Sequence, residues 1–112
     1  LSGGHRQRVA IARCLAQEPR LVLADEPISN LDPVRATEIL KLLTGASRAR
    51  GATVIFSSHQ PDLARRFADR IVGMRDGRIA FDVAVEDLSE AETAELYREA
   101  GIPPGTSLRA VS

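Results

Sequence analysis

The apolar positions of this chain change their period along the sequence, and the changes divide it into predicted helices and strands. A first helix follows Ser2 and ends before Pro19, because four small or apolar residues recur there at helical spacing: Val9, Ala12, Leu15 and Ala16. Asp32-Pro33 begins a second helix, with Asp as the N-cap and Pro in the first turn, and Gly51 marks its end. A third helix begins at Gln60-Pro61. Its predicted inner face carries Leu63, Ala64 and Phe67.

The predicted strands are short and contain few polar residues. Leu21–Ala24 and Thr53–Phe56 are continuous apolar runs, which is typical of strands covered on both faces. Ile71–Met74 and Ile79–Phe81 flank Asp76-Gly77, a pair that tolerates the positive φ angles of a tight hairpin turn. Strands that alternate with helices predict an α/β fold with a parallel sheet, followed by a hairpin.

The last third of the chain carries one clear helix signal. Ser89 and Glu92 have the spacing of a capping box, so a helix should follow and continue to about Ala100. The proline and glycine residues of the segment 101–105 predict an irregular tail after it.

Composition narrows the possible functions. The 112 residues contain 15 basic and 15 acidic side chains, and this balance disfavours a nucleic-acid-binding surface. The single Cys14 cannot form an internal disulfide, which suits a reducing compartment. No apolar run approaches the roughly 18 residues that a membrane span needs.

Two groups of polar residues fall where the predicted strands end. Asp25-Glu26 follows the first strand, and His59 follows the second after two serines. Parallel sheets bind their ligands at the carboxyl ends of their strands, so these side chains are candidate site residues. Taken alone, a solvated acidic pair at a strand end and a structural or exposed histidine are the more common interpretations of these residues.

The start of the chain is a candidate anion site. Ser2, Gly3 and Gly4 precede the first helix, where backbone N–H groups and the helix dipole favour a negative ligand such as a phosphate. On their own, these residues favour an ordinary helix start that contains two glycines. The continuation Gln7–Arg13, with the sequence QRVAIAR, adds a much longer pattern.

The order and spacing of these motifs resemble the second half of the nucleotide-binding domain of ATP-binding cassette (ABC) ATPases. Leu1–Arg13 is similar to the signature motif, although His5 stands where many members have glutamine. Asp25-Glu26 is similar to the Walker B element, Ser29–Asp32 to the D-loop, and His59 to the switch histidine. Asp32 would be a helix cap and a dimer contact at once.

The resemblance implies a role for each of these residues, with ATP and Mg²⁺ as the cofactors. Asp25 would hold Mg²⁺ through water, Glu26 would act as the general base, and His59 would contact the γ-phosphate. The signature residues Ser2, Gly3 and Gly4 would bind the ATP of the opposite subunit.

The resemblance also divides the chain into three parts. Residues 1–19 would be the signature helix of the helical subdomain, 20–84 part of the catalytic α/β core, and 85–112 the C-terminal helix and tail. The fold class it implies is the C-terminal portion of a P-loop NTPase domain, with parallel strands, flanking helices, a hairpin and a helix.

The chain contains no G-x-x-x-x-G-K-[ST] phosphate loop, and its only lysine is Lys41. We therefore expect it to be a piece of a longer polypeptide, unable to bind ATP tightly or to hydrolyse it alone. Two other interpretations remain: an ABC ATPase of DNA repair or translation, and an inactive truncated remnant. The leading interpretation is the ATPase subunit of a bacterial importer, and a phosphate loop upstream would support it.

The residues after His59 are similar to the ATPase subunit of phosphonate importers, as is the sequence Ala24–Pro27. A cassette for polar amino acids or for lipoprotein export is the alternative. The resemblance implies a second ATPase subunit, a membrane permease and a solute-binding protein as partners, and no nucleic acid. It implies a peripheral location on the cytoplasmic face of the bacterial inner membrane.

Overall fold

Helices and strands alternate along the chain in the computed structural model, which describes residues 3–101 and 107–111. The α-helices are α1 (Gly3–Ala16), α2 (Pro33–Ala49), α3 (Pro61–Phe67) and α4 (Glu90–Glu99), with a short 3₁₀ turn over Val85–Asp87. The strands are β1 (Leu21–Ala24), β2 (Thr53–Ser58), β3 (Arg70–Arg75), β4 (Arg78–Ala84) and β5 (Ser107–Val111). The expected helix cap at Ser2 and most of the tail at 101–105 lie outside the described residues.

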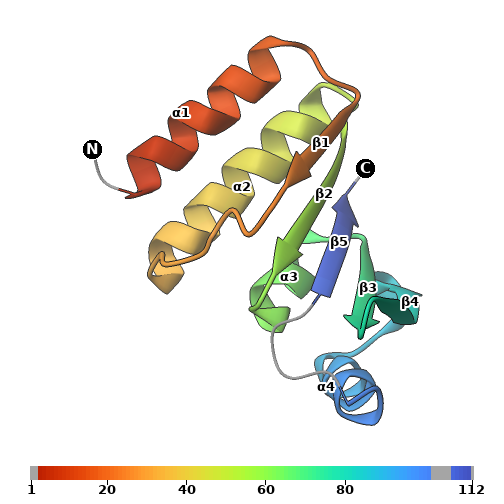
Figure 1. Cartoon of the computed structure of the whole chain (residues 1–112). Coiled ribbons are helices and arrows are strands. Elements are labelled where there is room, and N and C mark those ends of the chain that lie inside the picture. The colour runs from red at the N-terminus through yellow and green to blue at the C-terminus, as the bar shows by residue number, and fades with distance from the viewer. Residues whose placement is uncertain (1–2, 102–106, 112) are drawn as a thin grey trace.

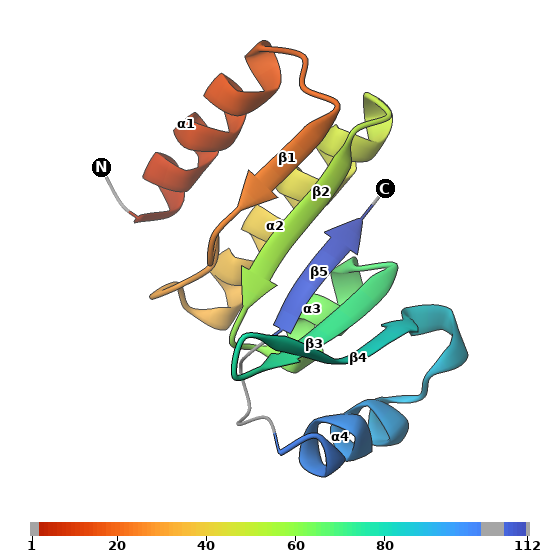
Figure 2. The ribbon, with the colours of Figure 1, turned by 45° about the vertical axis from the view of Figure 1, so that its right-hand side comes forward.

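The five strands form a single sheet in the order β1-β2-β5-β3-β4. β1 and β2 are parallel, with Leu21 beside Thr53 and Ala24 beside Phe56. β5 is antiparallel to both of its neighbours, β2 and β3, and β3 and β4 form an antiparallel hairpin. Figures 1 and 2 show β5 running through the middle of the sheet, between two strands that precede it in the sequence.

The larger core lies between the sheet and the two long helices. Helix α2 covers the rear face of β1 and β2, and α1 packs beside α2 (Figures 1 and 2). Alternation along β2 sends Val54 and Phe56 into this core, where both are fully buried. The remaining buried members come from both helices and from the segments around them: Ile11, Leu15, Val22, Ile28, Ala36, Ile39, Leu40, Leu43, Ala64 and Ala68.

A second, smaller core joins the hairpin to α4. Ile71 of β3 and Tyr97 of α4 are buried there, and the rings of Phe81 and Tyr97 meet edge to face with centroids 5.2 Å apart. The hairpin turns at Asp76 and Gly77, whose φ angles are 52° and 75°. The predicted Asp-Gly turn is therefore confirmed.

The sequence pattern predicted the element types correctly up to the end of α4. Asp32 caps α2, Pro33 is its first residue, and both bonds of the capping box between Ser89 and Glu92 are present. The predicted inner face of α3 is confirmed, with Ala64 buried and Leu63 and Phe67 packed against the larger core. Helix α2 ends before Gly51, whose φ of 67° suits a glycine.

The sheet differs from the expected parallel sheet in one respect. The strand β5 was not predicted, and it introduces antiparallel pairing at the centre. Its residues 107–111 give only a weak alternation of polar and apolar residues, and long-range pairing with β2 and β3 supplies the backbone partners that make it a strand.

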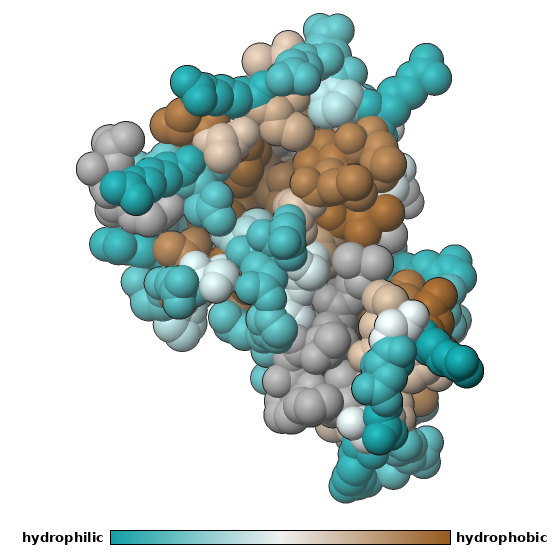
Figure 3. Space-filling view, in the orientation of Figure 1, coloured by the Kyte–Doolittle hydropathy of each residue, from teal (hydrophilic) through white to brown (hydrophobic). Residues whose placement is uncertain are grey.

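Among the described residues, no helix covers one face of the β1–β2 pair. Leu21 and Leu23 point to this face and are 51% and 72% exposed, while Ile55 beside them is half-buried. Figure 3 shows the result as a continuous hydrophobic area over β1 and β2. The expectation that these strands are covered on both faces therefore holds for one face of the described structure only. Within the described residues, no helix is both long and apolar enough to cross a bilayer.

The uncovered face and the open edge of β1 predict self-association of the purified chain. Leu23→Lys should weaken this association by roughly tenfold or more, because burying a leucine contributes roughly 1.5–3 kcal/mol and an edge charge opposes strand pairing. Light scattering and size-exclusion chromatography measure the effect. Val34→Lys is the matched control, since Val34 is 69% exposed on α2. An equal effect of both substitutions would contradict the prediction.

The capping box predicts an unusually acidic side chain at the start of α4. The Ser89 backbone N–H donates to the Glu92 carboxylate and, with the Ser89 side chain, lowers the pKa of Glu92 below its ordinary 4.5. A lowered pKa means that this contribution to stability is present above pH 4.5 and is lost as the pH falls through the folded-state pKa. Carboxyl titration by NMR should place the pKa of Glu92 below 4.5. Ser89→Ala should raise it only part of the way back, because alanine loses the side chain but keeps the backbone N–H.

Candidate functional site

The parallel pairing of β1 and β2 brings two chain segments to one edge of the sheet. Because Ala24 lies beside Phe56, the residues that follow each strand emerge next to one another. Asp25 and Glu26 leave β1 at this edge, and His59 follows the last residue of β2. The structure therefore brings together three of the residues predicted to form a site.

Glu26 and His59 are in direct contact. An oxygen of the Glu26 carboxylate, Oε1, pairs with Nε2 of His59, and the two side chains are 37% and 63% exposed. The backbone of Glu26 has a φ of 45°, an uncommon value for a residue with a side chain. Its carbonyl accepts a hydrogen bond from the N–H of Ser29 at 3.1 Å, so a tight turn holds this conformation.

Ser57 is a site residue that the sequence analysis missed. Its hydroxyl donates to Oδ1 of Asp25 at 2.8 Å and accepts from the backbone N–H of Glu26 at 2.7 Å. The signal for it was present in the pattern: Ser57 directly follows the apolar run of β2, at the same edge as Asp25. One hydroxyl therefore connects the two acidic residues.

A cleft of about 160 Å³ opens beside the Glu26–His59 pair. Its walls come from the turn after β1 and from the end of β2: Glu26, Ile28, Ser29, Asn30, Ser58, His59 and Gln60. The position of both walls is set by the parallel pairing of the two strands. Exposed polar groups beside a small cleft are suited to binding the end of a polar ligand.

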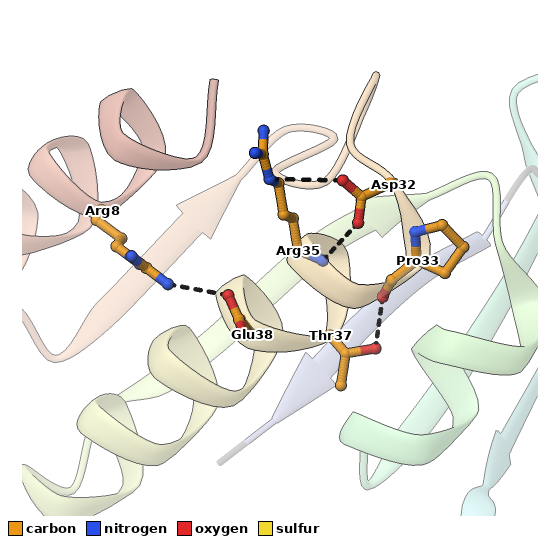
Figure 4. Close-up of polar contacts among 6 residues, drawn as sticks. All are labelled: Arg8, Asp32, Pro33, Arg35, Thr37 and Glu38. Carbon is orange, nitrogen blue, oxygen red and sulfur yellow. Dashed lines mark hydrogen bonds and ion pairs between the residues drawn. The ribbon is translucent and has the colours of Figure 1, made fainter. Parts of the chain in front are cut away.

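The expected anion site at the start of α1 forms a second group. Gly3 and Gly4 begin the helix, and Gly4 is buried, whereas Ser2 lies outside the described residues. A cavity of about 170 Å³ separates this end of α1 from α2 and is lined by Gly4, His5, Arg8, Arg35, Glu38 and Ile39. Arg8 of α1 closes one side of it by donating to the Glu38 carboxylate at 3.0 Å (Figure 4).

Asp32 lies at the start of α2 and acts there as a helix cap. Its Oδ1 accepts from the backbone N–H of Arg35 at 3.0 Å, and its Oδ2 lies 3.5 Å from the Arg35 side chain (Figure 4). Nearby, the hydroxyl of Thr37 donates to the carbonyl of Pro33 at 2.8 Å. The side chain of Asp32 is still 55% exposed, so a second molecule can reach it.

A side chain of α1 links the two groups. Gln7 donates from Nε2 to the carbonyl of Pro27, in the turn that follows Glu26. The helix that begins at the two glycines is thereby tied to the loop that carries the acidic residues. The structure thus gathers Asp25, Glu26 and His59 in one group. Gly3 and Gly4 lie at the start of α1, and Asp32 lies at the start of α2.

The donor set at the site fits a divalent ion that keeps most of its water. In the described part of the chain, no three potential ligands from His, Cys, Asp and Glu are grouped as a closed metal site. Asp25 is exposed and presents a single carboxylate. Mg²⁺ is commonly held by one or two carboxylates together with phosphate oxygens and water, which is compatible with this arrangement.

The chain is similar in sequence to members of one protein family. The model of the family described as ABC transporter matches residues 1–29. The chain is 51% identical to the phosphonates import ATP-binding protein of Thiobacillus denitrificans over 108 residues, which are 96% of this chain and 42% of that protein. It is 49% and 50% identical to the hypophosphite and phosphite import ATP-binding proteins of Stutzerimonas stutzeri, covering 94% and 87% of this chain and 30% and 35% of theirs.

Solved structures give the same result for the fold. A dimeric ATP-binding cassette in a post-hydrolysis state, bound to ADP and Pi, matches with a TM-score of 0.65 and 40% identity over 76% of this chain and 36% of that one. The cbiO1 protein from Clostridium perfringens, part of an ABC transporter complex, matches with a TM-score of 0.74 and 34% identity over 88% of this chain and 40% of that one. The chain thus spans less than half the length of the relatives described here.

Proposed function

We propose, from the premise that this chain belongs to the ABC transporter family of ATP-binding proteins, that it supplies the catalytic carboxylates and switch histidine of an import ATPase. The observation that carries the proposal is the Glu26–His59 pair beside Asp25, at the carboxyl ends of two parallel strands. The sequence identity of about half with import ATP-binding proteins supports it.

The reaction is hydrolysis of ATP to ADP and phosphate. Glu26 accepts a proton from a water molecule while the oxygen of that water bonds to the γ-phosphorus of ATP. The bond between the γ-phosphorus and the oxygen of the β-phosphate breaks, and ADP leaves. His59 contacts the Glu26 carboxylate through Nε2 beside the cleft, and it would contact the γ-phosphate of bound ATP.

Asp25 is the residue that would hold Mg²⁺, through water. The ion, when bound, neutralises charge on the phosphate oxygens. Asp25 suits this role because it is exposed, and because the hydrogen bond from Ser57 to its Oδ1 fixes the orientation of its carboxylate.

Ser2, Gly3 and Gly4 would bind the γ-phosphate of ATP held by an opposite subunit. The backbone N–H groups at the start of α1 and the positive end of its dipole favour that charge. Asp32, exposed at the start of α2, would contact the same subunit. The dimeric state of the solved ATP-binding cassette supports a head-to-tail pair, either of identical or of related ATPase subunits.

The imported solute would be a phosphonate or another small oxyanion of phosphorus. Support comes from the similar proteins, which import phosphonates, hypophosphite and phosphite. A membrane permease and a solute-binding protein would be the further partners, with the ATPase bound peripherally at the cytoplasmic face of the membrane. This location follows from the proposed role.

The chain alone should not bind ATP tightly, because its sequence contains no phosphate loop to surround the phosphates. Isothermal titration with Mg-ATP should show no binding at micromolar concentrations. A clear one-site isotherm in that range would contradict this division of roles.

Turnover can be tested in a joined protein, defined as the Thiobacillus denitrificans relative with its matching 108-residue region replaced by this chain. Glu26→Gln should keep ATP binding and lower turnover by roughly 10²–10⁴-fold, because the amide cannot accept the proton. Glu99→Gln, an exposed change on α4, is the matched control and should leave the rate unchanged. Retention of more than half the parent rate would remove Glu26 from the catalytic role.

His59→Ala in the same joined protein should also lower the rate of hydrolysis, since Glu26 loses its partner and the γ-phosphate loses a contact. The affinity for ATP should remain close to that of the parent. Steady-state kinetics together with nucleotide titration separate the two effects. Unchanged turnover would assign His59 a structural role only.

A further inference from the structure

We infer that Ser57 is a positioning residue of the ATPase site, which holds the Mg²⁺-binding carboxylate and the general base in a fixed relation. This inference rests on the proposed function. It concerns a residue outside the four motifs on which the proposal is based, and it comes from the geometry at the end of β2.

The hydroxyl of Ser57 has two partners on the neighbouring strand end. It donates its proton to Oδ1 of Asp25 at 2.8 Å and accepts the backbone N–H of Glu26 at 2.7 Å. A serine hydroxyl offers one donor and two acceptor positions, so both bonds can exist at once. The bond to the carboxylate is charge-assisted and therefore the stronger kind.

The backbone N–H of Glu26 donates to a side chain and not to a carbonyl of the neighbouring strand. The pairing of β1 with β2 ends at Ala24 and Phe56, and beyond it β2 pairs on its other side, where Ser57 lies beside Leu108 of β5. The Glu26 N–H is the second amide past the end of β1, and the Ser57 side chain takes the place of a ladder carbonyl there. With the bond from Ser29 to the Glu26 carbonyl, the backbone of Glu26 is held on both sides.

The end of β2 thus fixes both acidic residues. Ser57 orients the carboxylate of Asp25 and the backbone of Glu26, and His59, two residues later, contacts the carboxylate of Glu26. Any rotation of Asp25 or displacement of Glu26 must break a bond to this one strand end. Groups that orient a metal ligand typically change metal affinity or activity roughly 10–100-fold when they are removed.

The first test uses the chain itself and needs no nucleotide. Ser57→Ala removes the acceptor, so the Glu26 amide should exchange with solvent deuterium at least tenfold faster, as measured by NMR. Ser57→Thr keeps the hydroxyl and should retain the protection. Thr53→Ala is the matched control, because Thr53 lies on the same face of β2 at its opposite end, and it should not change exchange at Glu26.

The second test uses the joined protein. It distinguishes a loss of positioning by Ser57 from a general loss of protein stability. Ser57→Ala should lower kcat and raise the Mg²⁺ concentration needed for half-maximal rate, each by roughly 10–100-fold, with little change in the affinity for ATP. Ser57→Thr should restore both quantities, and Thr53→Ala should alter neither. A loss of stability alone would lower the amount of active protein without moving the Mg²⁺ midpoint.

Each result bears on a distinct claim. Unchanged exchange at Glu26 in Ser57→Ala, or an unchanged Mg²⁺ midpoint in an active joined protein, would overturn the role of Ser57. A joined protein that fails to hydrolyse ATP before any substitution would count against the proposed function, and the exchange measurement would then decide the role of Ser57 by itself.

Discussion

The parallel pairing of β1 with β2 is the constraint on which the rest of the site depends. It places Ala24 beside Phe56, so that the turn after one strand and the loop after the other leave the sheet side by side. The contacts among Asp25, Glu26, Ser57 and His59 all follow from this register. A shift of one residue in this register would turn Ser57 to the opposite face of the sheet and remove its contacts with Asp25 and Glu26.

The same pairing explains the uneven surface of the molecule. Parallel strands are usually covered on both faces, and α2 covers one face of β1 and β2 with the larger core. The other face keeps Leu21 and Leu23 in contact with solvent. Asp25, which is also exposed, follows these residues directly after the end of β1.

Local signals in the sequence were sufficient for most of the fold. A cap and a proline defined the start of α2, a capping box defined α4, and an Asp-Gly pair defined the hairpin, because each signal acts within a few residues. The strand β5 could not be predicted in this way. Residues 107–111 become a strand only through partners at residues 54–58 and 70–73, which lie between 34 and 57 positions earlier in the chain.

The candidate site shows the same limit. Asp25, Glu26 and His59 were found from their places after apolar runs, and the structure brings them together. Ser57 was missed because a serine at a strand end is common, and its importance depends on a hydroxyl that meets two groups at once across the sheet. This contact depends on which residues of β1 and β2 lie side by side, and the composition of the chain or the spacing of its residues does not predict that.

The central position of β5 has a consequence for the order in which the sheet is built during synthesis. β2 and β3 are made before the strand that joins them, and each has a free edge facing the other until residues 107–111 arrive. The halves of the sheet on either side can form early, as β1 with β2 and as the β3–β4 hairpin. Their union is then the late step of folding, and a nascent chain paused before this segment would expose two open strand edges at the middle of its sheet.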